Sequence, residues 1–450
     1  MKVIVIGAVA AGMSAASKLK RLKPDTEIIV YEKGSDVSYG ACGMPYYLSD
    51  LIKNEHDLIA KTTNDFKKAG ITVKINHEVV GIDVREKTVM VEHQAKSFKT
   101  PYDKLIIATG ARAIRLPIPG SDLKGIHVLN TLDDARALKK ALHQKTNKHI
   151  AVVGGGYIGL EVAENLILMD KEVTIIEREK GLLGLFDSFI GETVHEELTR
   201  LGVKVKINET IKAYEGTTNA NVVVTDKGKY AVDLIIEAVG IKPNTEFLWD
   251  DDIKMAKNGA ILVNRKMETS QKDIYAAGDC VAYPHRLKKD HAYVPLGTHA
   301  NKAGRVIAEQ IAGNKKQLFT HVIGSSVLKV GELEIAKTGL GEEEAKHEKL
   351  PYKYVMIEAR DKAGYYPNAT PIKIKMLYHE ETCSLLGAQM VGKQGVAHRI
   401  NTVAVALYRD MSAEAFSKLD FAYAPPFAPV YDPLQVAAMQ IHCQKKEREA

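Results

Sequence analysis

Cysteine is scarce in this sequence, and its scarcity argues against two kinds of site. The 450 residues include only Cys42, Cys280, Cys383 and Cys443, too few for a disulfide framework in so long a chain. No two of them have the C-x-x-C spacing of a zinc ligand pair or a dithiol centre, and we expect no metal site. The low cysteine content favours a reducing compartment, the cytoplasm.

Long apolar runs and blocks of like charge are also missing. No run approaches the roughly 18 apolar residues that a membrane span needs, so we expect no membrane anchor. Residues 3–6 are strongly apolar but far shorter than the core of a signal peptide, and we expect a buried strand there. The net charge of +6 comes from 62 basic and 56 acidic residues that are interspersed, which does not favour nucleic acid as a partner.

What the sequence does contain is a repeat. Twice, an apolar strand is followed by a glycine turn, a helix of small residues and a second strand that ends in an acid. The first copy has the loop Gly7-Ala8-Val9-Ala10-Ala11-Gly12 and the acid Glu32; the second has Gly154-Gly155-Gly156-Tyr157-Ile158-Gly159 and Glu177. This order predicts two dinucleotide-binding βαβ units.

Each glycine loop is suited to a diphosphate. The first glycine permits the tight turn, a small second residue lets the backbone approach the pyrophosphate, and the third allows the helix to pack on the strand. The N–H groups at the start of the helix attract the negative charge. A carboxylate such as Glu177 favours the ribose of NADH, whereas Arg178 could pair with the 2′-phosphate of NADPH, so both nucleotides stay open.

Further along the chain the repeat continues and then ends. In the first copy, a buried strand is expected directly before Ala108-Thr109-Gly110. In the second copy, a similar strand is expected before Glu237-Ala238-Val239-Gly240. After Ala277-Gly278-Asp279 and a helix at about 301–311, the pattern changes to strands of period two, such as residues 372–376. We therefore predict a third, α+β domain from about Gly324 onward.

Cys42 is the most informative single residue. It lies in Ser38-Tyr39-Gly40-Ala41-Cys42-Gly43-Met44-Pro45-Tyr46, ten residues after Glu32. Because Pro45 suits the first turn of a helix, we expect the thiol near a helix N-terminus, where a thiolate nucleophile is stabilised. The other three cysteines lack such a setting, and we interpret them as structural or incidental.

With these motifs in place, the chain resembles the flavin-dependent pyridine nucleotide-disulfide oxidoreductases of the single-cysteine branch, above all the coenzyme A disulfide reductases. The resemblance covers essentially the whole chain. It is most specific in Ser-x-x-x-Cys-Gly-x-Pro-Tyr combined with Tyr423-Ala424-Pro425-Pro426-Phe427. Val9 in place of a glycine matches this branch, whereas Ala41 replaces an asparagine that relatives often carry and removes one expected hydrogen bond to coenzyme A.

The resemblance implies an α/β fold with two doubly wound, Rossmann-like domains. It places an FAD-binding domain at residues 1–115 and 245–323, an NAD(P)H-binding domain at 116–244 and a C-terminal α+β dimerisation domain at 324–450. The last would form a homodimer, because this superfamily completes each site with residues of the partner subunit.

The resemblance also implies which residues bind each molecule. For FAD these are Gly7, Ala8, Val9, Ala10, Ala11, Gly12, Glu32, Lys33, Ser38, Val80, Ala108, Thr109, Gly110, Gly278, Asp279, Pro295, Gly297, Thr298 and Ala300, with Glu32 on the adenosine ribose and Asp279 on the ribityl chain. For NAD(P)H they are Gly154, Gly155, Gly156, Tyr157, Ile158, Gly159, Glu177, Arg178, Val239 and Gly240. For coenzyme A they are Lys18, Arg21, Ser38, Cys42, Tyr366 and Tyr423.

By the same resemblance, Cys42 is the redox residue and rests as a mixed disulfide with coenzyme A. Tyr366 and Tyr423 would reach the partner's site and donate protons or hydrogen bonds to the departing thiolate. His442 and Glu447 have the His-x-x-x-x-Glu spacing of the acid-base pair in dithiol relatives, but they lie in a charged tail, and we interpret the match as chance.

Three other functions stay open. Cys42 could cycle through a sulfenic acid, as in NADH oxidases and peroxidases of this superfamily. A persulfide or polysulfide could be the acceptor, since the same thiolate would serve. A non-enzymatic redox sensor is the third, although a sensor has no need for a nucleophile beside the flavin.

Overall fold

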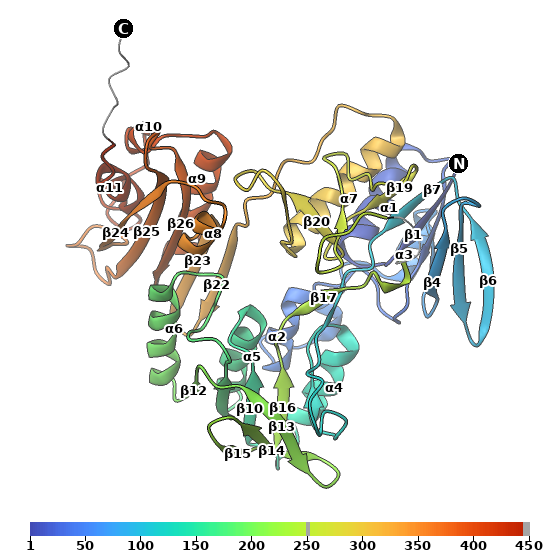
Figure 1. Cartoon of the computed structure of the whole chain (residues 1–450), viewed down its shortest axis with the longest axis horizontal. Coiled ribbons are helices and arrows are strands. Elements are labelled where there is room, and N and C mark those ends of the chain that lie inside the picture. Colours follow the sequence, from blue (N-terminus) through green and yellow to red (C-terminus); the bar gives the residue numbers. More distant parts are fainter. Residues whose placement is uncertain (249–252, 444–450) are drawn as a thin grey trace. The chain divides into compact units, whose positions relative to one another are not determined.

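The computed structural model describes residues 1–248 and 253–443. The chain divides into two compact units (Figure 1). Met1–Ile114, Leu129–Lys140 and Gly240–Val322 form the first unit, and Arg115–Val128, Ala141–Val239 and Ile323–Ala450 form the second. The domain boundaries given above stay a prediction.

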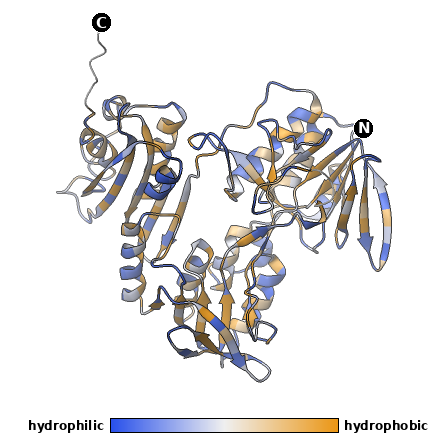
Figure 2. Cartoon of the chain, in the orientation of Figure 1, coloured by the Kyte–Doolittle hydropathy of each residue, from blue (hydrophilic) through white to orange (hydrophobic). Residues whose placement is uncertain are grey.

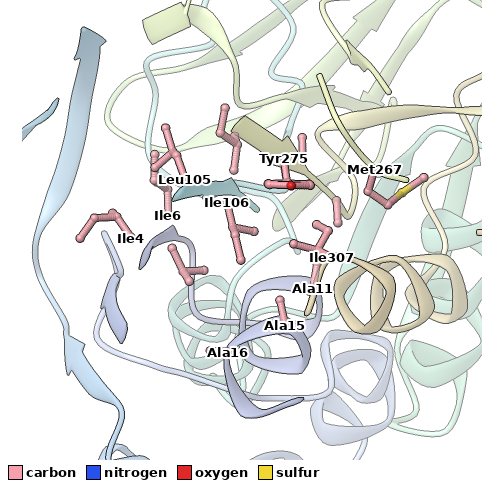
Figure 3. Close-up of a cluster of buried hydrophobic side chains, with 14 of the residues drawn as sticks. Ile4, Ile6, Ala11, Ala15, Ala16, Leu105, Ile106, Met267, Tyr275 and Ile307 are labelled. Atoms are coloured by element: carbon pink, nitrogen blue, oxygen red, sulfur yellow. The ribbon is translucent and has the colours of Figure 1, made fainter. Parts of the chain in front are cut away.

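A five-stranded parallel sheet is the centre of the first unit. Its order is β19-β7-β1-β2-β3, made of Ile274–Ala276, Lys104–Ile107, Lys2–Ile6, Glu27–Tyr31 and Thr72–Lys74. Two long helices, α1 (Ala10–Leu22) and α7 (Gly297–Ala312), pack against each other. Side chains of these strands and helices form one hydrophobic core (Figure 3). Strands buried on both faces explain why residues 3–6 are an unbroken apolar run.

Smaller elements complete the first unit. Two antiparallel sheets have the orders β4-β5-β6 and β17-β8, and a third, of both parallel and antiparallel pairs, is β18-β20-β21. These strands are β4 (Glu78–Asp83), β5 (Thr88–His93), β6 (Lys96–Pro101), β8 (Ala111–Ala113), β17 (Ile241–Pro243), β18 (Ile261–Leu262), β20 (Val281–Pro284) and β21 (His291–Ala292). The short helices are η1 (Ala41–Gly43), α2 (Met44–Leu48), η2 (Glu55–Leu58), α3 (Thr63–Lys68), α4 (Leu132–Leu142) and η3 (Glu246–Leu248).

The second unit begins with a copy of the same parallel arrangement. The sheet β12-β11-β10-β16-β9 consists of Lys204–Lys206, Glu172–Ile176, His149–Val153, Leu234–Glu237 and Ile126–His127. Its helices are α5 (Tyr157–Ile167) and α6 (Ser188–Arg200), and an antiparallel meander is formed by β13 (Ile211–Gly216), β14 (Ala220–Thr225) and β15 (Lys229–Ala231). Because β10 pairs with β11 and β16 as β1 pairs with β2 and β7, the duplication is confirmed.

The rest of the second unit is the α+β domain expected near the C-terminus. Its antiparallel sheet has the order β22-β23-β26-β25-β24, from Ser326–Val330, Leu333–Gly339, Leu385–Gly392, Pro371–His379 and Tyr352–Arg360. The helices are α8 (Glu342–His347), α9 (Val396–Tyr408), α10 (Ala413–Ser417) and α11 (Pro433–Met439). The predicted fold class, two doubly wound domains and an α+β domain, is therefore correct.

Hydrophobic residues concentrate in the strands of the sheets, whereas helix faces and hairpins carry the hydrophilic ones (Figure 2). Across the part of the chain that the structure describes, no helix combines the length and apolar character that crossing a membrane requires. The same residues hold no cluster of three or more His, Cys, Asp or Glu side chains that could bind a metal ion.

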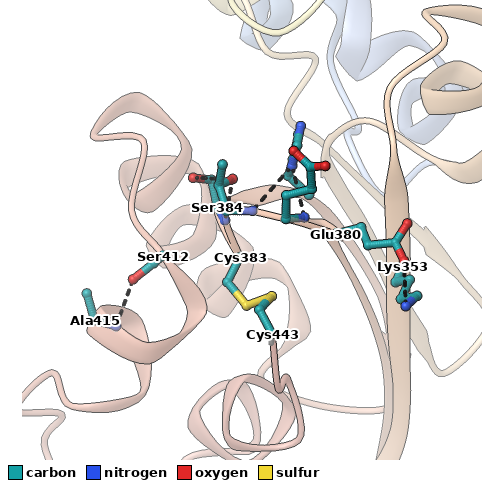
Figure 4. Close-up of a disulfide and its surroundings, with 10 residues drawn as sticks. Lys353, Glu380, Cys383, Ser384, Ser412, Ala415 and Cys443 are labelled. Atoms are coloured by element: carbon teal, nitrogen blue, oxygen red, sulfur yellow. Dashed lines mark hydrogen bonds and ion pairs between the residues drawn. A yellow bond between two sulfur atoms is a disulfide. The ribbon is translucent and has the colours of Figure 1, made fainter. Parts of the chain in front are cut away.

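Cys383 and Cys443 form a disulfide. Because 60 residues separate them, their pairing could not be predicted from local sequence. Cys383 follows β25 and Cys443 follows α11, so the bond connects the end of the described chain to the antiparallel sheet of the C-terminal α+β domain (Figure 4). A structural role for both residues agrees with our interpretation. However, disulfides are rare in reducing compartments, so the cysteine content no longer favours the cytoplasm as the location of this protein.

Candidate active site

The first glycine loop is shaped by two close backbone approaches. Gly7 has φ +102°, and a Cβ there would lie 2.2 Å from the Ala108 carbonyl oxygen at the end of β7. A Cβ on Gly12 would lie 2.0 Å from the Gly7 carbonyl oxygen. Only glycine fits at both places, so α1 starts directly at the edge of the sheet. Its N-cap, Val9, makes no side-chain cap, which leaves the first N–H groups available to a phosphate.

Glu32 braces this loop from the neighbouring strand. One carboxylate oxygen accepts from the Ala8 N–H at 2.7 Å and the other from the Gly34 N–H at 2.8 Å. From the other side, the Ser38 N–H donates to the Ala8 carbonyl at 2.8 Å. The end of β2, the loop and the segment that leads to Cys42 are thus tied together at Ala8.

The Ala277-Gly278-Asp279 turn lies against the same helix. Gly278 has φ +92°, and a Cβ there would lie 3.2 Å from the Ala11 side chain. Burial raises the pKa of the Asp279 carboxyl. Among the described residues no group donates a hydrogen bond to that carboxylate, although Tyr293 donates to the Asp279 backbone carbonyl at 2.9 Å. A partly buried carboxylate without a donor suits the hydroxyl groups of a ribityl chain.

The other residues expected to contact FAD occupy four places. The Thr109 hydroxyl donates to the Asn244 carbonyl at 2.7 Å, which anchors the Ala108-Thr109-Gly110 turn. The residues Pro295, Gly297, Thr298 and Ala300 lie at the start of α7, where Ala300 is 3.9 Å from a Cβ built on Gly278. Lys33 is exposed and pairs with Glu78 at 2.7 Å. Val80 lies in a bulge of β4.

Cys42 lies in the one-turn helix η1 and has an exposed thiol. Its segment is held in place by the chain beyond it, because the Gly40 N–H donates to the Leu58 carbonyl at 2.8 Å. The N-cap of the following helix is Gly43, with Pro45 in the first turn, so the expected helix is present. However, α2 has only five residues, and its dipole is too small to account alone for a stabilised thiolate.

The second glycine loop repeats the first. Gly154 has φ +105°, and a Cβ there would lie 2.4 Å from the Ala238 carbonyl oxygen. A Cβ on Gly159 would lie 2.0 Å from the Gly154 carbonyl oxygen. Val239, the residue after Ala238, packs against the core of this domain. The repeat of both close approaches supports a second dinucleotide site on α5.

Glu177 occupies the same position in this loop as Glu32 does in the first. It accepts from the Gly155 N–H at 2.6 Å and from the Glu179 N–H at 2.8 Å. The Arg178 side chain is turned to Glu179, with Nη2 at 2.9 Å from its carboxylate. Both side chains are mostly exposed, so this pair is weak and does not remove Arg178 from a nucleotide phosphate.

Tyr423 is paired with a tyrosine that the sequence analysis did not choose. Its hydroxyl lies 3.0 Å from that of Tyr365, and this hydrogen bond raises the pKa of Tyr423. The neighbouring Tyr366 instead has its backbone N–H bonded to the Ala363 carbonyl at 2.8 Å. The local sequence does not show which of two adjacent tyrosines reaches a given partner. Here the contact with Tyr423 distinguishes Tyr365 from Tyr366. Glu447, the second residue of the chance match with His442, lies outside the described residues.

Lys18 faces a pocket rather than open solvent. Its ammonium lies 2.6 Å from the Glu309 carboxylate, and it lines a cavity of about 310 Å³ together with Lys302 and Arg305 of α7. Arg21, one turn further along α1, is exposed and does not line this cavity. The sequence analysis missed Lys302 and Arg305, because their nearness to Lys18 follows only from the packing of α1 on α7.

A further residue that the sequence analysis missed is Glu161, on the helix that begins at the second glycine loop. Burial, and then the nearby Glu164 carboxylate, raise the pKa of Glu161 to about 7. The signal available in the sequence was an acid within the otherwise apolar start of α5.

Comparison with known proteins decides the family. The model of the pyridine nucleotide-disulphide oxidoreductases matches residues 1–304, and that of their dimerisation domain matches residues 325–433. The chain belongs to this family. It is therefore an NAD(P)H-dependent flavoprotein oxidoreductase, and the two glycine loops and the donor-free Asp279 fit FAD and NAD(P)H.

Relatives of this oxidoreductase carry different names. A protein named NADH oxidase from Methanocaldococcus jannaschii is 35% identical over 97% of this chain and 98% of its own. A coenzyme A disulfide reductase from Staphylococcus haemolyticus is 34% identical over 95% and 96%. The structure of a NAD-dependent persulfide reductase from A. fulgidus has a TM-score of 0.95 at 34% identity, and the match covers 98% of this chain and 83% of that one. The family therefore leaves the electron acceptor to be argued from the site.

Glu161 predicts how the stability of the oxidoreductase depends on pH. Its pKa is about 7 in the folded chain against an ordinary value of 4.5, so the folded state holds a proton that the unfolded state has lost between these values. The contribution of Glu161 to the free energy of unfolding is therefore fully present below about pH 4.5, and it is lost as the pH rises to about 7. We expect Glu161→Gln to stabilise the protein at pH 8 by roughly 3 kcal/mol and to change little at pH 4.5.

Urea unfolding of both proteins at these two pH values measures the effect. Glu192→Gln, which removes an exposed carboxylate of α6, is the control and is expected to be neutral at both. Equal stability of Glu161→Gln and the unchanged protein at pH 8 contradicts the assignment.

Proposed function

We propose that this oxidoreductase reduces the disulfide of coenzyme A at the expense of NAD(P)H, with Cys42 as its only redox-active cysteine. The observation that carries the proposal is an exposed thiol four residues after Ser38, the residue whose N–H is bonded to the FAD-binding glycine loop. The only other cysteine outside the disulfide, Cys280, is fully buried, and burial raises its pKa to about 11. A second thiol suited to a dithiol mechanism is thus missing from the described residues.

The chemistry balances with one protein thiol. The Cys42 thiolate attacks one sulfur of the substrate, forms a mixed disulfide with coenzyme A and releases the first coenzyme A thiolate, which takes up a proton. FAD, when bound, supplies the two electrons of a hydride from NAD(P)H to that mixed disulfide. Cys42 is regenerated as the thiolate and the second coenzyme A leaves. The sum is NAD(P)H, one proton and one disulfide converted to NAD(P)⁺ and two thiols.

The pocket of Lys18, Lys302 and Arg305 supports coenzyme A over a smaller disulfide. Three cations around one cavity suit a ligand with several phosphate groups, and the Glu309 carboxylate holds Lys18 in place until that ligand arrives. Arg21 lies on the same helix as Lys18 but does not line the pocket. This pocket also distinguishes the proposal from an oxidase, because oxygen and peroxide have no use for a phosphate site.

Two tyrosines are proposed to assist the leaving thiolate. Tyr423 is one, as the sequence suggested, and its hydrogen bond to Tyr365 favours Tyr365 over Tyr366 as the other. The Tyr423 phenol is protonated at neutral pH, as phenols ordinarily are, so it can donate a hydrogen bond to a developing sulfur anion.

A homodimer and a cytoplasmic location complete the proposal. The dimerisation domain exposes large apolar side chains, namely Tyr354, Met356, Tyr365, Phe427, Val430 and Tyr431. An exposed set of this kind is typical of a surface covered by another subunit, and the family match to a dimerisation domain supports a second copy of this chain as that subunit. The cytoplasmic location is proposed from the reaction and not from the cysteine content, because reduction of disulfides to thiols serves a compartment in which thiols are kept reduced.

Replacing Cys42 tests the proposal. Cys42→Ser is expected to keep FAD and the NAD(P)H site but to lose reduction of coenzyme A disulfide by a factor of at least about 10³, because the attacking sulfur is gone. Cys383→Ser combined with Cys443→Ser, which removes the disulfide without leaving a new free thiol and keeps Cys42, is the control. Coenzyme A disulfide, a persulfide, peroxide and oxygen should be compared as acceptors. Turnover highest with oxygen or peroxide would favour the oxidase, and full activity of Cys42→Ser would refute both.

Variants that each remove one phenol hydroxyl distinguish the roles of the three tyrosines. Tyr365→Phe and Tyr423→Phe should each lower kcat by about 10- to 100-fold, with little further loss in the double variant, because the two hydroxyls act as one pair. Tyr366→Phe is expected to stay near the starting activity. Loss of activity in Tyr366→Phe alone would restore the assignment made from the sequence.

The pocket is tested by removing charge. Lys302→Met combined with Arg305→Met should raise KM for coenzyme A disulfide by about tenfold or more and leave KM for NADH unchanged, because charge-assisted contacts to phosphate are lost. Lys316→Met removes a positive charge from an exposed position outside the pocket and is the control. An unchanged KM in the double variant means that the phosphates bind elsewhere.

A further inference from the structure

The chain between β11 and α6 reaches back to the second glycine loop. The Leu183 N–H donates to the Gly155 carbonyl at 2.9 Å, and a Cβ on Gly155 would lie only 2.4 Å from the Leu182 side chain. Gly155 lies between the first motif glycine, Gly154, and the second, Gly156, at which the backbone approaches a bound pyrophosphate. The segment 181–187, which we call the bracing segment, therefore helps to set the shape of the loop that receives the dinucleotide.

The far end of the bracing segment is held by the sheet of the dimerisation domain. The Lys337 ammonium donates to the Leu185 carbonyl at 2.6 Å, and the Gln389 side-chain oxygen accepts from the Asp187 N–H at 2.8 Å. The Lys375 ammonium lies 2.8 Å from the Asp187 carboxylate. Three strands, β23, β25 and β26, thus each contribute one polar side chain to the same short segment.

These contacts are buried, which makes their geometry strict. The Lys375 and Asp187 side chains are 6% and 9% exposed. Burial alone would lower the pKa of Lys375, but the hydrogen bonds to Asp187 and Glu342 raise it, so the ammonium stays charged. Because a buried ion is costly once its partners move away, this cluster resists displacement of the bracing segment.

A second set of contacts joins the same sheet to the glycine loop itself. Tyr157, the first residue of α5, has its hydroxyl 2.6 Å from the Ser326 hydroxyl of β22. Its ring lies 5.9 Å from that of Phe186, in the bracing segment. Lys329 of β22 forms an ion pair with Glu164, two turns along α5. The loop and the helix after it are therefore attached to the dimerisation domain at separate points.

We propose that Ser326, Lys337, Lys375 and Gln389 of the dimerisation domain are positioning residues for NAD(P)H, which hold the second glycine loop in its binding conformation. The proposal depends on dinucleotide binding by this loop and not on coenzyme A as the acceptor. It assigns the C-terminal sheet a task in addition to any contact with a second subunit.

The expected effect follows from a population argument. When only a fraction of molecules holds the binding conformation, the apparent dissociation constant rises by the inverse of that fraction. Loss of an anchor lowers the fraction without changing any group that touches the nucleotide. KM for NADH should therefore rise, while kcat at saturating NADH and the FAD content stay unchanged.

The Tyr157–Ser326 contact offers the mildest test. The FAD-loaded Ser326→Ala variant and the unchanged protein are titrated calorimetrically with NAD⁺, which binds without turnover. Ser326→Ala should weaken NAD⁺ binding about three- to tenfold, the size of one net hydrogen bond. Unchanged affinity for NAD⁺ in Ser326→Ala overturns the role of this anchor.

The buried cluster is tested with a lysine pair on one strand. Lys375→Met should weaken NAD⁺ binding by about tenfold or more, and Lys375→Arg should recover part of it, whereas Lys373→Met, two residues away on β25 and partly exposed, should be neutral. Hydrogen exchange at the Leu183 amide should speed up in Lys375→Met only. If Lys375→Met does not fold, the Tyr157–Ser326 titration decides alone. Wild-type affinity in both Lys375→Met and Ser326→Ala overturns the proposal.

Discussion

Two backbone contacts govern both nucleotide sites: the glycine that opens each loop lies directly against the carbonyl at the end of a neighbouring strand. Gly7 does this over Ala108 and Gly154 over Ala238, and in each case a Cβ would stand within 2.4 Å of the carbonyl oxygen. The contact brings the start of a helix to the edge of a parallel sheet, where unbonded N–H groups can receive a diphosphate. A side chain at either glycine would move the helix and dismantle the site.

A short chain of hydrogen bonds connects the first loop to the segment that carries Cys42, the proposed redox residue. Ala8 accepts from Ser38 and donates to Glu32, and the segment after Ser38 carries Cys42. Cys42 is exposed and precedes a helix of only five residues, so its placement depends on the hydrogen bonds of this segment and not on a long helix dipole. The pocket proposed to bind the phosphates lies elsewhere in the same unit, where α1 and α7 place three cations around one cavity.

Sequence patterns were sufficient where the determinants are local. Both glycine loops, their acids and the change of period near Gly324 follow from neighbouring residues, and the fold agrees with them. The features that escaped prediction join distant segments. Lys302 and Arg305 meet Lys18 only through helix packing, and Cys383 meets Cys443 across 60 residues. Tyr365 and Tyr366 share one motif, and only the turn that brings Tyr423 close distinguishes them. The contacts between Lys375 and Asp187 likewise depend on tertiary packing.

The central claim, a single cysteine that exchanges disulfides with coenzyme A, is tested most directly by mass spectrometry of the protein isolated without reductant. The account predicts a peptide that contains Cys42 and carries the mass of one coenzyme A, which is lost when NADH is added. Cys42 found bonded to another cysteine of the chain, or recovered only as an oxygen adduct that coenzyme A disulfide does not replace, would contradict it.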